Sequence, residues 1–187
     1  MKTMKLFGML LLAVTFSAYA QKSDINLNLS VVKWTGNKIG GSHNGEIKIK
    51  SGFFEIKGDD ITKGFVEMDM NSITNSDLEN EVYNQKLVGH LKSDDFFGVE
   101  KYPTATFQLV TASKFMSGKA TVSGSLTIKG QSENISFDVI KKGNTYTTQI
   151  KVDRSKFNVR YGSNSFFDNL GNRAIDDIFI LDIRIIL

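Results

Sequence analysis

The chain of 187 residues contains no cysteine, and this absence removes several functions at once. Without thiols the protein has no disulfide, no thiolate metal site and no cysteine nucleophile. It has one proline, Pro103, so no proline-rich linker joins separate modules. Its two histidines, His43 and His90, show no H-x-x-x-H or H-E-x-x-H spacing, so we expect no metal site and no cofactor.

Long hydrophobic runs are missing as well, apart from a short one at the N-terminus. We therefore do not expect a protein embedded in a membrane by helices. The basic residues are scattered among nearly as many acidic ones, with a formal net charge of +3, and form no continuous stripe. A nucleic-acid partner is not predicted, because such partners require a concentrated basic surface.

Residues 1–20 have the organisation of a signal peptide. Lys2 and Lys5 precede an apolar stretch from Leu6 to Phe16, and Ala18-Tyr19-Ala20 follows as a cleavage pattern. We predict cleavage after Ala20 and a periplasmic protein with a single domain over residues 21–187. An uncleaved N-terminal anchor is the alternative, although the apolar stretch is short for a membrane span.

Alternating apolar and polar residues predict strands along most of the remaining chain. The longest example runs from Ala120 to Ile128, with every second residue small or apolar. Turn signals separate such runs about every ten residues, as in an antiparallel sandwich or barrel. They fall at Gly40-Gly41, Ser51-Gly52, Gly58-Asp59-Asp60, Ser117-Gly118, Lys129-Gly130 and Gly143-Asn144. One segment differs: Ser76 and Glu79 form a capping-box pattern that predicts a helix over residues 77–92.

Four sequence pieces resemble the YceI-like family. The most specific is H-L-K-S-D-D-F-F from His90, followed by Y-P-T-A-T-F from Tyr102. The others are W-T-G from Trp34 with G-S-H-N-G from Gly41, V-S-G-S-L-T-I-K-G from Val122, and D-R-S-K-F from Asp153. The resemblance implies an all-β fold with one or two short helices, namely an eight-stranded antiparallel lipocalin-like barrel. It also implies export to the bacterial envelope and binding of polyisoprenoids or other long apolar chains inside the barrel. An Arg-Asp pair common in the family before the His-Leu pair is absent here, so a head-group role of that arginine does not carry over.

The apolar strand faces are the first candidate site. In a closed barrel they either fill the interior or line a cavity, and a one-residue shift in register would place polar side chains inside. The predicted lining residues are Trp34, Val66, Met68, Met70, Phe107, Leu109, Val122, Leu126, Ile128, Phe137 and Ile150. Met116 is expected to join Met68 and Met70 as adaptable lining. A tightly packed core is the alternative.

A polar mouth is the second candidate site. We expect His90, Lys92 and Arg154 to contact the head group of a ligand, with Arg160 and Tyr161 nearby. Two alternatives stay open: solvated surface charges, and a structural His90 that fixes the helix to the barrel by hydrogen bonds. The pairs Phe96-Phe97 and Phe166-Phe167 are interpreted either as ligand walls or as plugs that close the barrel.

The sequence shows no catalytic constellation, because it has no phosphate loop, no nucleophile elbow and no dinucleotide fingerprint. We therefore predict a non-enzymatic protein that binds a long-chain isoprenoid or another amphiphilic lipid, for storage or transport. One alternative is an envelope stress or structural protein without a ligand. The other is an envelope hydrolase or isomerase using His90 with Asp94 or Asp95. A homodimer is left open.

Overall fold

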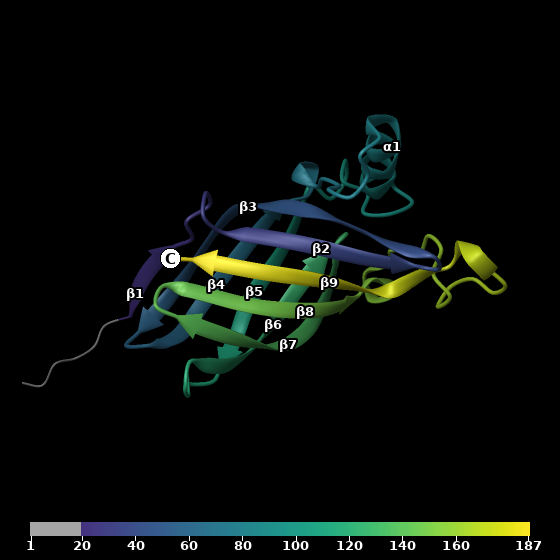
Figure 1. The fold of residues 1–187 in the computed structure, drawn as a ribbon. Coiled ribbons are helices and arrows are strands. Elements are labelled where there is room, and N and C mark those ends of the chain that lie inside the picture. Colours follow the sequence, from purple (N-terminus) through teal and green to yellow (C-terminus); the bar gives the residue numbers. More distant parts are fainter. Residues whose placement is uncertain (1–19) are drawn as a thin grey trace, which may run out of the picture.

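Eight antiparallel strands close into a barrel in the computed structural model, which describes residues 20–187 (Figure 1). In spatial order the strands are β2, β9, β8, β7, β6, β5, β4 and β3, and β3 closes the ring by pairing with both β4 and β2. The strand bounds are β1 Gln21–Asp24, β2 Val31–Lys38, β3 Gly41–Lys57, β4 Asp60–Asp69, β5 Thr104–Ala112, β6 Lys119–Ile128, β7 Gln131–Lys142, β8 Thr145–Asp153 and β9 Ile175–Ile186. The predicted barrel is confirmed. The predicted signal peptide lies outside the described residues except for Ala20.

The long strand β3 corrects one predicted turn. Its 17 residues pair with β2 over the first part, Gly41–Ile47, and with β4 from Lys48 onward. The Ser51-Gly52 signal marks a β-bulge inside this strand, where the register with β4 shifts, and not a turn. A side chain at Gly52 would overlap the carbonyl of Phe65. Glycine is therefore needed there because the two strands come close together.

The strand β6 shows how the sequence pattern builds the barrel. Its residues alternate between the surface and the interior along the whole strand, and Ala120, Val122, Leu126 and Ile128 are buried. Successive side chains of a strand point to opposite faces, so one face fills the interior and the other meets water. The alternation predicted from the sequence is confirmed for this strand.

The helix α1, Glu81–Lys92, projects from one end of the barrel (Figure 1). It begins four residues later than the capping-box pattern predicted. Asn80 caps it, accepting a hydrogen bond from the Tyr83 amide at 3.2 Å, while the Ser76 amide donates to the carbonyl of Asn44 on β3 at 2.9 Å. The segment before the helix thus binds the barrel instead of starting the helix. Within residues 20–187 no helix has the length and apolar character needed to cross a bilayer.

Three short 3-10 helices complete the described chain: η1 Met70–Ser72, η2 Arg154–Phe157 and η3 Gly171–Arg173. The helix η1 follows β4 and turns Met70 into the interior, where this residue is buried. The helix η2 directly follows β8 and carries Arg154 and Phe157 inward. Both helices begin after an aspartate whose side chain accepts a backbone hydrogen bond, Asp69 and Asp153 respectively. These aspartates are N-caps, which explains where each strand ends.

Candidate ligand-binding cavity

A cavity of about 210 Å³ lies inside the barrel, and its wall is almost entirely apolar. All eleven residues predicted as lining lie on this wall. They come from β2, η1 and strands β4 to β8, so residues far apart in the sequence meet around one lumen. Strand alternation explains the agreement, because it decides which side chains point inward. Whether these side chains bind a ligand stays a prediction.

Two aromatic rings meet in the wall of the lumen. The rings of Phe107 on β5 and Phe137 on β7 lie 5.4 Å apart between centroids, across the inner face of β6. Gly124 on β6 makes room for this arrangement, since a side chain there would overlap the Phe107 ring. The glycine in the predicted strand is therefore a packing requirement.

Trp34 anchors the wall near the helix. Its indole Nε1 donates a hydrogen bond to the carbonyl of Thr74 at 3.0 Å, which satisfies the one polar atom of a buried ring. Gly45 on the neighbouring strand β3 lies against both groups, and a side chain there would overlap them. Trp34 thus presents an apolar face to the cavity while its polar edge binds backbone.

Arg154 closes one end of the cavity and is 2% exposed. Its guanidinium donates four hydrogen bonds to carbonyl oxygens: Nε to Asp176 at 3.0 Å, Nη1 to Val159 and Tyr161 at 2.9 Å, and Nη2 to Ile175 at 2.9 Å. Burial lowers the pKa of this group, and the neighbouring carboxylates of Asp177, Asp153 and Asp176 oppose that shift. With its donors already used, Arg154 ties η2 to β9 and is not the free cation at a mouth that the sequence suggested.

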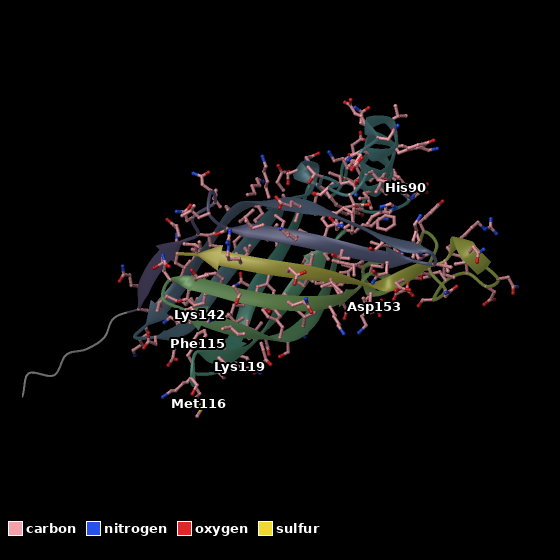
Figure 2. All side chains as sticks on the ribbon, in the orientation of Figure 1. His90, Phe115, Met116, Lys119, Lys142 and Asp153 are labelled. Atoms are coloured by element: carbon pink, nitrogen blue, oxygen red, sulfur yellow. The ribbon has the colours of Figure 1, made fainter. Side chains whose placement is uncertain are left out.

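His90 and Lys92 lie at the same end of the barrel but do not line the cavity. The His90 ring packs edge-on against Tyr161, with centroids 4.4 Å apart, and against Phe96 at 5.8 Å. Its Nε2 is buried and has no hydrogen-bond partner among residues 20–187. The helix is therefore held here by ring packing and not by the hydrogen bonds proposed for a structural His90. Figure 2 shows His90 at the helical end, far from Lys142 and Met116.

The predicted pairing of His90 with an acid is not formed in the described part of the chain. Asp94 accepts a hydrogen bond from Lys101 Nζ at 2.8 Å, and this bond lowers the pKa of Asp94. Lys129 also points at this turn, donating to the carbonyls of Asp94 and Phe96 at 2.8 and 2.6 Å. The turn after α1 is thus organised around two lysines, and His90 lies outside that network.

The other end of the cavity is closed by Tyr146, whose ring packs against Phe54 and Phe115. Burial raises the pKa of the Tyr146 hydroxyl. Lys141 lies over the Phe115 and Tyr146 rings and pairs with Asp59 at 2.7 Å. An aromatic layer covered by an ion pair therefore closes this end, on the side of the Lys142 and Phe115 labels in Figure 2.

Sequence reasoning missed several wall residues and included some wrong ones. The missed residues include Leu91 of α1, Ile47 and Phe54 of β3, and Phe179, Leu181, Ile183 and Ile185 of β9. In β9 the apolar outer residues Ile178 and Ile180 masked the alternation. The prediction for Met116 was wrong, because it lies in the β5–β6 loop and is 77% exposed. Phe166 and Phe167 are also exposed, so they neither line the cavity nor close it. Phe96 and Phe97, in contrast, line the cavity.

The chain matches the YceI-like domain family over residues 20–186. No curated protein matches it significantly. Solved structures with the same fold include BcnA of Burkholderia cenocepacia, with a TM-score of 0.69 and 23% identity over 88% of this chain and 99% of that one. A polyisoprenoid-binding domain from Saccharophagus degradans gives a TM-score of 0.60 and 13% identity over 89% of this chain and 97% of the other.

A mutant YceI protein of Campylobacter jejuni is a third neighbour, with a TM-score of 0.51 and 20% identity over 98% of this chain and 97% of that one. At these identities the structural similarities establish the fold. They agree with the barrel topology described above.

Proposed function

Because the chain belongs to the YceI-like domain family, we propose that it is an exported protein that holds a long apolar lipid of the polyisoprenoid type inside its barrel. It does so without catalysing a reaction and without a cofactor. Export is supported by the signal-peptide pattern of residues 1–20. The ligand class is supported by the similarity to the Saccharophagus degradans domain, which is a polyisoprenoid-binding domain.

The apolar cavity is the observation that carries the proposal. Its wall offers side chains such as Met68, Phe107 and Leu126, and the polar atoms of Trp34 and Arg154 at its edge are bound to backbone. A chain that buries apolar surface there gains about 25 cal/mol per Å². Part of this gain is offset by the entropy lost when a flexible chain is ordered. Affinity would therefore come from the hydrocarbon part of the ligand.

The size of the cavity limits how much of a chain it holds. A volume of about 210 Å³ is below the range of roughly 300–1,000 Å³ that is typical of pockets for drug-sized ligands. A long isoprenoid would place one segment in the lumen, and flexible side chains such as Met68 and Met70 would rearrange to admit more. The same small volume favours a second candidate, an envelope protein with a filled core and no ligand.

Native mass spectrometry of protein purified from its own host separates these two functions. We expect a mass excess over the mature chain that disappears after solvent extraction, with a long-chain lipid in the extract. Protein expressed without a lipid source and then incubated with polyprenol vesicles serves as the matched control and should acquire an excess equal to the mass of the added polyprenol. An unmodified mass in both preparations would overturn the lipid-binding proposal and favour the filled core.

A further inference from the structure

The barrel wall is incomplete between two neighbouring strands. The ladder between β7 and β8 holds only three residue pairs, Ile140 with Thr147, Lys141 with Tyr146 and Lys142 with Thr145. By contrast, β6 pairs with β7 over ten positions and β8 with β9 over nine. Because β7 extends back to Gln131 and β8 forward to Asp153, most of their facing edges have no ladder. We call this unpaired stretch the seam.

A single side chain bridges the start of the seam. Thr148 Oγ1 donates a hydrogen bond of 2.7 Å to the carbonyl oxygen of Asp138, one residue beyond the last ladder pair on β8. This bond joins one side chain to one strand edge and does not extend the sheet. The remaining backbone groups along the seam have no strand partner on that side, which in other proteins marks an edge open to new contacts.

The seam brings the cavity wall and the outer surface of the barrel together. A groove of about 1,070 Å³ runs over the outer surface of β7, β8 and β9, and it shares Ile135, Phe137, Thr148, Ile150 and Ile183 with the cavity wall. Inward-facing Ile135 and Phe137 are only partly buried, whereas Val122 and Ile128, inward-facing on the fully paired strand β6, are 3% and 5% exposed. Interior apolar surface is therefore less completely covered along β7 than along β6.

Both ends of the cavity are obstructed by contacts that would have to break. Arg154 ties one end through four carbonyl hydrogen bonds, and Tyr146 closes the other beneath the Lys141–Asp59 pair. Opening the seam, in contrast, breaks one hydrogen bond between the two strands, that of Thr148, besides the packing of the apolar side chains at the seam. Local opening costs least where backbone hydrogen bonds and buried contacts are few, as they are along the seam.

We propose that the seam between β7 and β8 is the route by which the apolar chain of a lipid enters and leaves the cavity. This inference rests on the proposed lipid-binding function and adds the direction of passage, through the side of the barrel. The partner is an amphiphile with a slender hydrocarbon chain, because the seam is bordered by Ile135, Phe137 and Ile150.

A reversible link across the seam tests the route. Ser136 and Lys151 would face each other if the hairpin register continued, and both are exposed. The chain has no cysteine, so S136C/K151C provides the only two thiols for a short, cleavable linker that carries a thiol-reactive maleimide at each end. The readout is the rate at which a preloaded dansyl-labelled farnesyl probe leaves the protein for phosphatidylcholine vesicles. The control is S123C/S136C, which links β6 to β7 where the ladder is complete.

We expect the seam link to slow release at least about tenfold, cleavage of the linker to restore the rate, and the control link to leave it unchanged. A second variant, Thr148→Val, removes the bridging hydrogen bond at nearly constant volume and should speed release. Equal release from linked and unlinked protein, with both loaded, would overturn the seam route and leave lipid binding intact. Failure of the unlinked protein to load the probe would overturn both proposals.

Discussion

Asp177 Oδ1 lies 3.4 Å from Arg154 Nη2 and accepts no hydrogen bond within residues 20–187. The other carboxylate oxygen of Asp177 accepts a hydrogen bond from Ser165 Oγ at 2.6 Å. The guanidinium thus directs its hydrogen bonds to backbone carbonyls, and Asp177 acts as the counter-charge. This separation of roles predicts unequal effects when either partner is changed.

Substitution of Arg154 should be among the most destabilising single changes. Arg154→Ala leaves four carbonyls and the Asp177 charge without their partner, and we expect the free energy of unfolding to fall by about 3–5 kcal/mol. Arg154→Lys should cost at least about 2 kcal/mol, because an ammonium group cannot reproduce the planar fork. Asp177→Asn should lower the free energy of unfolding by less than either substitution of Arg154. Urea denaturation measures all three, and wild-type stability in Arg154→Lys would contradict this assignment.

His90 offers a test of ring packing against hydrogen bonding. Since its Nε2 has no partner within residues 20–187, His90→Phe should keep the contacts with Tyr161 and Phe96 and change the unfolding free energy by less than about 1 kcal/mol. His90→Ala loses both ring contacts and should be less stable than His90→Phe. Thermal melts of the two variants provide the comparison. Loss of a turnover in His90→Phe, at unchanged melting temperature, would instead point to the enzyme alternative.

Asp77 should make the stability of the protein depend on acid pH. Burial tends to raise its pKa, but hydrogen bonds from the Asn44 amide, His43 and Asn75 outweigh this and lower it below the ordinary 3.8. A lowered folded-state pKa stabilises the protein above the unfolded-state value, and the contribution is lost as pH falls through the folded value. Asp77→Asn should therefore cost about 1–2 kcal/mol near neutral pH.

The cost of Asp77→Asn should shrink once the pH drops below 3.8, because the wild-type carboxyl is then being protonated. Urea denaturation of both proteins at a series of pH values gives the difference directly. A difference that stayed constant across the acid range would show that the carboxylate charge does not contribute.

Larger side chains in the lumen should displace lipid. Val122→Phe and Leu126→Trp point into the cavity, so bound lipid measured by extraction should fall while the barrel stays folded. Ser125→Trp is the matched control on the outer face of the same strand and should leave the lipid content unchanged. If the core is filled, the two inward substitutions would instead lower the free energy of unfolding by about 1–3 kcal/mol and leave the amount of extracted lipid unchanged.

Cleavage after Ala20 predicts that protein from the envelope fraction begins at Gln21. The position is consistent with the fold, because β1 begins at Gln21 and pairs from that residue onward with β3. N-terminal sequencing or intact mass measures the start. Protein that retains Met1 in a membrane pellet would support the uncleaved anchor.

Strand alternation made the cavity wall predictable. The period of two along a strand decides which face each side chain points to. The inward direction of Val122 and Phe137 could therefore be predicted without knowing which strand pairs with theirs. Met70 also lies on the wall although η1, and not β4, carries it. Alternation predicts nothing for residues outside the strands, and Met116, which lies in the β5–β6 loop, is exposed.

Tertiary partners explain what the sequence could not predict. The sequence suggests that Arg154 is a surface cation, but in the fold four carbonyls, from the segment after η2 and from β9, surround its guanidinium. The capping pattern of Ser76 is outcompeted by a hydrogen bond to Asn44, which is 32 residues earlier in the chain. The sequence does not predict the seam between β7 and β8 either, because apolar and polar residues continue to alternate in both strands beyond the end of their ladder.

The position of β9 between β2 and β8 has a consequence for how the protein reaches its folded state. Pairing of Val31–Lys38 with Ile175–Arg184 joins segments from opposite ends of the chain, a contact of high sequence separation that forms slowly. A ribosome-bound chain lacking its last strand would have an open sheet with two unpaired edges. Closure of the barrel therefore waits for β9, and the strands made before it cannot form the complete cavity wall without it.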